Sequence, residues 1–263
     1  MKILAVETAT AWQSVAILDD RTIVARHDHE AAGSHGKLLL PTIDRLFRET
    51  GLSLVSLDGL VVSIGPGSFT GLRVGLATML GFRTISKLPL AVVPTLEGMA
   101  WNLRGASDLL CPVVSSRRGE VYWAVFRWID DHRVERIVPE QVGPPAALGA
   151  QLKERTIVFG EGWDRESDTV RAALAHRATI IREAAMEAHR PSAVSIGLAG
   201  IQRLARGEQA GIGVGPFYVQ RSEAELKYEQ SGGASPLARR QAKLLRKRGG
   251  RMAIAGAKRK TAK

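Results

Sequence analysis

The segment that most constrains the fold is a strand that runs directly into a glycine-rich turn and then into a helix. Residues 60–64 form an apolar, mostly β-branched run that predicts a buried strand. Gly65-Pro66-Gly67 follows and predicts a tight turn that leaves backbone amides uncovered. Ser68 stands at the N-cap position of a helix predicted over residues 69–86, so the helix N-terminus faces the space above the strand. The turn lacks the lysine of a phosphate-binding P-loop, which argues against ATP chemistry here.

One pattern of three antiparallel strands occurs twice in the chain. The first copy turns at Asp19-Asp20 and the second at Asp130-Asp131, which lie 111 residues apart. Similar apolar strands flank both turns, so we predict an internal duplication. The predicted strands lie at residues 2–8, 14–18, 22–26, 112–115, 121–128 and 133–138.

The net charge of +11 is confined to one end of the chain. Residues 231–263 contain eleven Lys and Arg and no Asp or Glu, so the remaining 26 basic and 26 acidic residues cancel. This tail has no aromatic residue and too few apolar residues for a core of its own. A cationic arm of this kind favours polyanions through counterion release. We therefore expect RNA contact through Arg239, Arg240, Lys243, Arg246, Lys247 and Arg248, although a solubilising extension explains the composition equally well.

Composition excludes several classes of protein. The N-terminal apolar run is much shorter than the core of a signal peptide, and Glu7 interrupts it. No apolar stretch approaches the length of a membrane span. Cys111 is the only cysteine, so neither an intramolecular disulfide nor a cysteine-based zinc site can form. We expect a reduced, cytoplasmic, globular protein.

Two helices of the first half carry more apolar residues than a single buried stripe requires. Ser34 stands where it can cap a helix that ends at Gly51, and Pro41 predicts either a start near Leu40 or a kink. The second helix follows the glycine-rich turn and has few charges. A helix that is apolar nearly all round needs cover on two sides. Packing on a sheet alone and packing on a sheet and a partner both remain open at this point.

No catalytic or metal-binding pattern stands out among the titratable side chains. The six histidines are scattered, and none forms a His-x-x-x-His pair. Ser68 lies in Gly-Ser-Phe rather than in the Gly-x-Ser-x-Gly elbow of hydrolases. We therefore predict no metal, no cofactor and no catalytic residue.

Five motifs follow one another along the chain, at residues 3–10, 34–41, 65–75, 118–124 and 216–221. The third reads Gly-Pro-Gly-Ser-Phe-Thr-Gly-Leu-Arg-Val-Gly, and the last reads Pro-Phe-Tyr-Val-Gln-Arg. Together they closely resemble the TsaB family, the dimerisation subunits of the bacterial complex that makes threonylcarbamoyladenosine in tRNA. The resemblance covers roughly residues 1–230.

This resemblance implies an α/β fold of two tandem actin-like ATPase (RNase H-like) subdomains. It implies an N-terminal subdomain over residues 1–107 and a reduced C-terminal subdomain over residues 108–230. A helix near residues 192–206 is expected to brace the first subdomain, and residues 231–263 are expected to form a disordered basic tail.

The resemblance also implies partners. It implies that this chain dimerises with TsaD through helices of the N-terminal subdomain and joins TsaE in a ternary complex, and we expect a homodimer when the partner is absent. We expect contact with tRNA either indirectly or through the tail, which lies outside the resemblance. The expected interface residues are Leu39, Leu40, Ile43, Leu46, Phe47, Leu72, Leu76, Met79 and Leu80. The glycine-rich loop is expected to contact a nucleotide or the partner through Gly65, Pro66, Gly67, Ser68, Phe69, Thr70, Gly71 and Arg73.

By the same resemblance, this chain has lost the chemistry of its catalytic relative. TsaD carries a metal-binding His-x-x-x-His where this chain has Thr95 and Met99, and neither side chain replaces an imidazole. Actin-like ATPases carry Asp where this chain has Glu7, whose extra methylene moves the carboxylate by about 1.5 Å and leaves a degenerate phosphate site. A structural role for Glu7, such as capping the turn at residues 8–10, explains this position at least as well.

We therefore expect a non-catalytic subunit that supports transfer of a threonylcarbamoyl group to the tRNA adenosine next to the anticodon. The alternatives are an active small kinase or ATPase of the same fold, using Glu7 and the glycine-rich loop, and an RNA-binding module acting through the tail.

Overall fold

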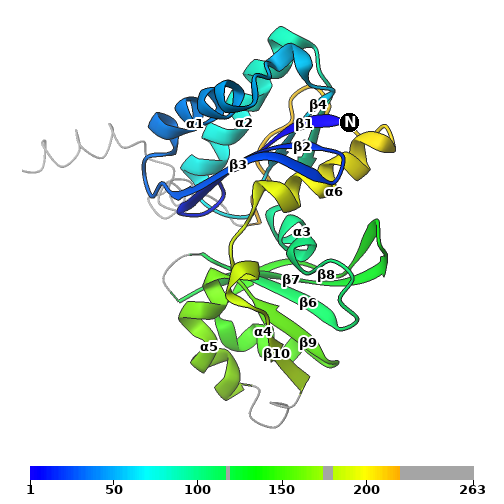
Figure 1. Cartoon of the computed structure of the whole chain (residues 1–263). Coiled ribbons are helices and arrows are strands. Elements are labelled where there is room, and N and C mark those ends of the chain that lie inside the picture. Colours follow the sequence, from blue (N-terminus) through cyan, green and yellow to red (C-terminus); the bar gives the residue numbers. More distant parts are fainter. Residues whose placement is uncertain (117–118, 174–179, 220–263) are drawn as a thin grey trace, which may run out of the picture. The chain divides into compact units, whose positions relative to one another are not determined.

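The computed structural model describes residues 1–116, 119–173 and 180–219. The first of its two sheets is formed by the N-terminal strands. This sheet has the order β3-β2-β1-β4-β5, with β1 antiparallel to β2 and parallel to β4 (Figure 1). Strand β1 is buried along nearly its whole length because helices cover both faces of the sheet. The strands are β1 (Lys2–Glu7), β2 (Trp12–Asp19), β3 (Thr22–Glu30), β4 (Gly59–Ser63) and β5 (Leu90–Val93).

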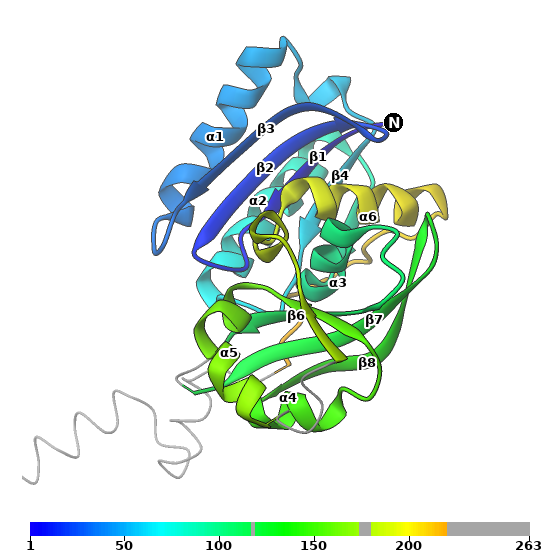
Figure 2. The same ribbon diagram turned by 60° about the horizontal axis from the view of Figure 1, so that its bottom comes forward.

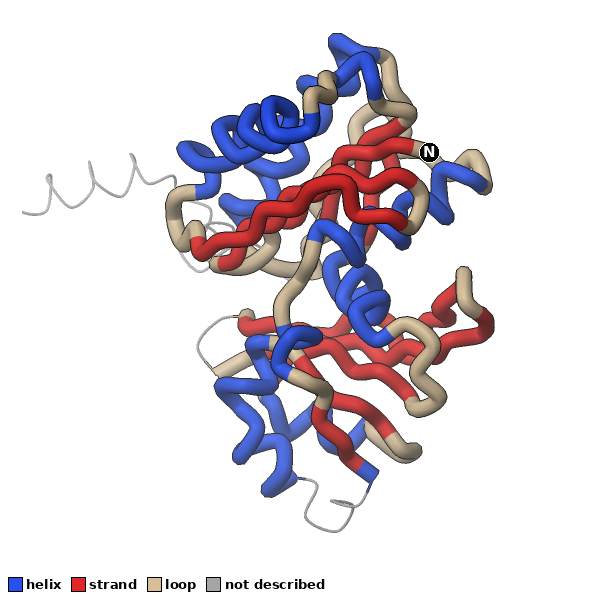
Figure 3. The backbone as a smooth tube through the Cα atoms, in the orientation of Figure 1, coloured by secondary structure: helices blue, strands red, loops and turns tan. Residues whose placement is uncertain are grey.

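A second five-stranded sheet repeats this order as β8-β7-β6-β9-β10. Its strands are β6 (Leu109–Ser115), β7 (Val121–Asp130), β8 (Arg133–Gly143), β9 (Thr156–Phe159) and β10 (Ile181–Glu183). In each sheet three antiparallel strands precede two parallel ones. Figure 3 shows the two groups of strands in red with the helices in blue. The predicted duplication and the actin-like α/β fold are thus confirmed.

The two halves differ in their helices rather than in their strands. Helices α1 (His35–Thr50) and α2 (Phe69–Ser86) pack beside each other on the first sheet and have 16 and 18 residues. Their counterparts α4 (Pro145–Gln151) and α5 (Glu161–Ala173) have 7 and 13 residues. The predicted reduction of the second half therefore falls on its helices.

Two further helices cross between the halves. Helix α3 (Thr95–Ala100) follows β5 but packs on β6, β7 and β8, and it continues into η2 (Trp101–Leu103). Helix α6 (Ala193–Ala205), which follows the short η4 (Met186–His189), packs back on β1, β2, β4 and β5. Figure 2 shows α3 and α6 side by side. Arg203 on α6 forms an ion pair with Glu97 on α3 at 2.7 Å.

The ends of the two long helices confirm some predictions and correct others. Ser68 caps α2, because its Oγ accepts a hydrogen bond from the Gly71 amide at 3.2 Å. Gly51 ends α1 in the left-handed conformation, as predicted. However, the Ser34 side chain makes no capping bond, and α1 begins at His35 rather than near Leu40, with Pro41 inside the helix. Pro41 is exposed, so water can satisfy the carbonyl that it leaves without a donor.

Residues after α6 form an extended segment that returns to the first sheet. The Ala210 amide donates to the Leu90 carbonyl, and the Phe217 amide donates to the Ile64 carbonyl, both at 2.7 Å. A 3-10 turn, η1 (Leu54–Ser56), links α1 to β4. Residues Met1–Val219 form one compact unit. Within the described ranges, no helix combines the length and the apolar character needed to cross a membrane.

Candidate functional site

The glycine-rich turn before α2 packs directly against the turn between β1 and β2. A Cβ atom at Gly71 or Gly75 would overlap Thr8, and one at Gly67 would overlap the Ala9 carbonyl. The Ser68 amide donates to that carbonyl at 2.6 Å, and Thr8 Oγ1 donates to the Gly71 carbonyl at 2.9 Å. The Ser68 amide is therefore not left uncovered for a ligand, and the glycines are explained by the close approach of two backbones.

Glu7 lies beneath the same turn and is completely buried. Its Oε1 accepts a hydrogen bond from the Ala9 amide at 2.5 Å, which holds the β1–β2 turn. Its Oε2 and the neighbouring Ser63 Oγ are buried without a hydrogen-bond partner in the part of the chain that the structure describes. Burial raises the pKa of Glu7 to about 7, and the Ala9 amide offsets only part of this effect.

A cleft of about 340 Å³ lies beside the two turns, and we call it the nucleotide-type cleft because it includes Gly67 and Ser68 of the loop expected to contact a nucleotide or the partner. The first half contributes the β1–β2 turn together with Gly67 and Ser68, and the second half contributes Tyr122, Glu161 and Arg165 with two serines. Glu7 does not line this cleft. The residue predicted as a degenerate phosphate site therefore supports the turn from below.

The second half supplies one acidic and one basic side chain, Glu161 and Arg165, that the motifs did not single out. Glu161 begins α5 directly after β9 and Gly160, whose φ is +114°. Burial raises the pKa of Glu161, and the nearby Arg165 offsets part of this. The arrangement repeats the strand–glycine–helix order found at Gly65, so the internal duplication was the signal that could have located it.

No ready-made metal site accompanies the cleft. The structure places Thr95 and Met99, the counterparts of the expected histidine positions, in the fully buried interior. Among the described residues, no group of three or more His, Cys, Asp and Glu side chains is arranged to hold a metal ion. In the described part of the chain, the cleft therefore offers hydroxyls, one carboxyl group and one guanidinium.

The structure buries most of the predicted partner-interface residues in this chain's own core. Six of the nine are at most 4% exposed, namely Leu39, Ile43, Leu46, Leu72, Leu76 and Met79. They lie between the two helices and the first sheet. The apolar residues at helical spacing in the sequence are therefore explained by packing in this chain's own core. Leu40 is 54% exposed, and Phe47 and Leu80 are half-buried. These six side chains are buried in the chain's own core, and their part in a partner interface stays a prediction.

A different set of residues on the same helices faces outward. On α1 these are the exposed Gly36 and Leu40; on α2 they are the exposed Ala77 and Gly81, together with the half-buried Val74, which also packs against the core. The helices meet here, since a Cβ at Gly36 would lie 3.8 Å from Val74 Cγ2. A Cβ at Gly81 would meet no other atom within 4 Å. We call these five residues the α1/α2 outer face; its small side chains would let another helix approach closely.

The start of α2 carries an exposed aromatic and cationic stack. The guanidinium carbon of Arg73 lies 3.7 Å from the centroid of the Phe69 ring. Arg73 Nε donates to Tyr218 Oη at 3.0 Å, and the rings of Tyr218 and Phe69 stack with centroids 5.2 Å apart. Phe69, Thr70 and Arg73 are thus exposed members of the glycine-rich motif, whereas Gly65, Pro66 and Gly71 are buried. The predicted RNA contacts between Arg239 and Arg248 lie outside the described residues.

The repeated strand order and the cleft between the halves define an α/β protein of the actin-like ATPase fold. A family model described as "TsaD: tRNA N6-adenosine threonylcarbamoyltransferase" matches residues 27–228. The tRNA threonylcarbamoyladenosine biosynthesis protein TsaB of Escherichia coli (strain K12) is 33% identical over 177 residues, covering 64% of this chain and 74% of that protein. TsaB of Bacillus subtilis (strain 168) is 28% identical over 235 residues, covering 88% of this chain and 99% of that protein.

Among solved structures, YeaZ from Pseudomonas aeruginosa matches with a TM-score of 0.70 and 23% sequence identity. The match covers 82% of this chain and 99% of that chain, and it supports the fold. The chain belongs to the TsaB family, as the motifs predicted.

Proposed function

We propose that this chain is a non-catalytic cytoplasmic subunit of the machinery that makes threonylcarbamoyladenosine in tRNA. It would dimerise with TsaD and, with TsaE in a ternary complex, support transfer of the threonylcarbamoyl group to the adenosine next to the anticodon. The observation that carries this proposal is membership of a family whose named proteins act in this biosynthesis. The match of a TsaD family model to most of the chain supports a common ancestry with the proposed partner.

The interior of the first half supports the non-catalytic part of the proposal. A carboxylate that handles phosphate has to reach the cleft, but Glu7 is buried beneath the β1–β2 turn. One of its oxygens already accepts a hydrogen bond from the Ala9 amide. The Ala9 carbonyl in turn accepts a hydrogen bond from the Ser68 amide, so this amide is not available to bind a phosphate. An active kinase or ATPase of this fold is therefore the weaker proposal.

The α1/α2 outer face supports the dimerisation part. Leu40 offers an exposed apolar side chain, while Ala77 and Gly81 present little bulk on the neighbouring helix. Two helices of a partner could pack here as a bundle, because small residues permit close helix approach. The same face would support a homodimer when the partner is absent. The Phe69–Arg73–Tyr218 stack lies at one end of α2 and would extend the contact.

Association with TsaD tests the location of this interface. Ala77→Arg places a long charged side chain in the centre of the outer face without disturbing the core, because Ala77 is exposed. Ala150→Arg, at an exposed position of α4, is the matched control. In sedimentation or isothermal titration with purified TsaD, the α2 variant should lose at least about tenfold in affinity. Equal affinity of both variants for TsaD would show that the α1/α2 outer face is not the interface.

A further inference from the structure

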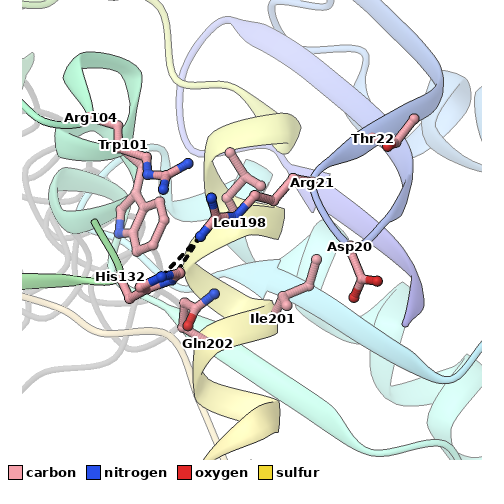
Figure 4. Close-up of a pocket in the computed structure, with 9 residues that line it drawn as sticks. All are labelled: Asp20, Arg21, Thr22, Trp101, Arg104, His132, Leu198, Ile201 and Gln202. Atoms are coloured by element: carbon pink, nitrogen blue, oxygen red, sulfur yellow. Dashed lines mark hydrogen bonds between the residues drawn. The ribbon is translucent and has the colours of Figure 1, made fainter. Parts of the chain in front are cut away.

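The two duplicated hairpin turns lie against each other in space. Arg21 follows the Asp19-Asp20 turn, and His132 holds the same place after the Asp130-Asp131 turn, 111 residues later. The terminal nitrogen Nη2 of Arg21 lies 2.9 Å from Nδ1 and 3.1 Å from Nε2 of His132. Figure 4 shows the Arg21 side chain reaching across to the His132 ring. The duplication thus brings one basic residue from each half to a common point.

A cavity of about 410 Å³ opens beside this contact, on surfaces that the nucleotide-type cleft does not include. Its apolar part is formed by Trp101 of η2 and by Leu198 and Ile201 of α6. Arg21, Arg104 and His132 supply its basic part. The remaining lining residues are polar, namely Asp20, Thr22 and Gln202. We call this space the hairpin cavity; its volume falls within the range of small-molecule sites, which begins at about 300 Å³.

The charges around the hairpin cavity leave one guanidinium uncompensated. Arg104 is held by Asp131, whose carbonyl accepts from Nε at 2.8 Å and whose carboxylate lies 3.7 Å from Nη2. The Asp20 carboxylate lies 2.9 Å from the Met1 nitrogen and, in Figure 4, is directed away from the Arg21–His132 contact. Within the described ranges, no carboxylate forms an ion pair with Arg21. Its positive charge therefore faces an imidazole rather than an anion.

We propose that the hairpin cavity binds a small organic carboxylate. The carboxylate would pair with the Arg21 guanidinium, which contacts His132 but forms no ion pair among the described residues, and an arginine can hold a carboxylate through two parallel hydrogen bonds. The hydrocarbon body would lie against Trp101, Leu198 and Ile201, which inorganic phosphate cannot use. This inference does not depend on the proposed role in tRNA modification, because none of these residues belongs to the α1/α2 outer face or to the nucleotide-type cleft.

Binding here would have a structural consequence. The lining comes from the hairpin of the first sheet, the hairpin of the second sheet, and the crossing helix α6. A ligand that contacts all three adds contacts between the two halves in the folded state alone. Ligand binding should therefore raise the thermal midpoint of the protein in a concentration-dependent manner.

The test uses the full-length protein and fluorine NMR of 4-fluorobenzoate as the probe, with 4-fluorobenzamide as its neutral isostere and inorganic phosphate as a competitor. Arg21→Gln removes the proposed anchor at an exposed position. Arg133→Gln is the matched control, because Arg133 begins β8 directly after the neighbouring turn and does not line the cavity. Thermal unfolding of each variant without probe checks that the fold is intact.

We expect 4-fluorobenzoate to bind in the roughly millimolar range typical of such a small molecule. Arg21→Gln should weaken binding about tenfold or more, whereas Arg133→Gln should leave it unchanged. The benzamide and phosphate should bind much more weakly than the carboxylate. The proposal is overturned if the carboxylate does not bind at all, if the benzamide binds equally well, or if the two arginine variants behave alike.

Discussion

Glu7 shows how burial beneath a turn determines what a carboxyl group at the end of a strand can do. The carboxyl group stands at the end of β1, where an ATPase would use it, yet it bonds the Ala9 amide and leaves Oε2 without a partner. A buried carboxylate without full hydrogen bonding is costly, so the neutral form is favoured and the pKa rises to about 7. Glu7 therefore holds the β1–β2 turn through its bond to Ala9. Its burial destabilises the folded state more as the pH rises and the carboxyl group ionises.

Because of this cost, we predict that Glu7→Gln stabilises the folded protein more at high pH than at low pH. The folded-state pKa of about 7 lies above the ordinary glutamate pKa of 4.5, so the stabilisation by neutral Glu7 is complete below pH 4.5 and is lost as the pH rises through 7. The variant keeps a neutral side chain at every pH. Its free energy of unfolding relative to wild type should therefore increase by roughly 2–3 kcal/mol between pH 5 and pH 8. Urea unfolding at both pH values measures this, with exposed Glu49→Gln as the control; a difference that does not change with pH contradicts the account.

At the scale of elements, α2 combines two kinds of glycine. Gly71 and Gly75 face the β1–β2 turn, where a methyl group would overlap Thr8. Gly81 faces open space on the other side of the same helix. At Gly71 and Gly75 the low helix propensity of glycine is offset by close packing against Thr8. At Gly81 no neighbouring atom among the described residues requires glycine.

Alanine substitutions at these positions should have opposite effects. Gly71→Ala forces the helix and the turn apart and should lower the free energy of unfolding by about 1–3 kcal/mol. Gly81→Ala should raise it by about 0.5–1 kcal/mol, because alanine has the higher helix propensity and meets no obstacle. Chemical denaturation of the two variants and the wild type decides the matter. Stabilisation by Gly71→Ala would show that the close approach to Thr8 is not needed.

The elements themselves were predictable, because their signals are local. Apolar alternation, the Asp-Asp turns, Gly51 and Ser68 located the strands and helix ends within a few residues. The interface residues were less predictable, because helical periodicity marks apolar positions without saying whether a sheet or a partner covers them. Leu76 and Leu40 look alike in the sequence, yet one is 4% and the other 54% exposed.

The hairpin cavity and the Glu161–Arg165 pair depend on which loops meet, and such long-range placement is not encoded in a local pattern. The internal duplication predicted that the two halves would be alike, but it did not predict that Arg21 and His132 would touch. Glu7 illustrates the same limit. Its position at the end of a strand was evident, whereas its burial beneath the following turn required the structure.

At the scale of the whole molecule, the charge separates the chain into a neutral body and a basic C-terminal segment. All of the excess of +11 lies within residues 231–263, outside the described ranges. If this segment contacts tRNA, removal of residues after Gly232 should weaken tRNA binding about tenfold or more and flatten its salt dependence. Filter binding at several salt concentrations measures both, with replacement of the six basic residues between Arg239 and Arg248 by glutamine as the charge control. Unchanged tRNA affinity would favour a solubilising role.

The measurement that tests the central proposal most directly is threonylcarbamoylation of tRNA in a reconstituted reaction. The reaction would contain TsaD, TsaE and the threonylcarbamoyl adenylate, with this chain present, omitted or replaced by a variant. We expect modification to require this chain, to survive Glu7→Gln, and to fail with Ala77→Arg while Ala150→Arg remains active. Full modification without the chain, or its loss with Glu7→Gln in an otherwise intact complex, would contradict a non-catalytic role as a supporting subunit.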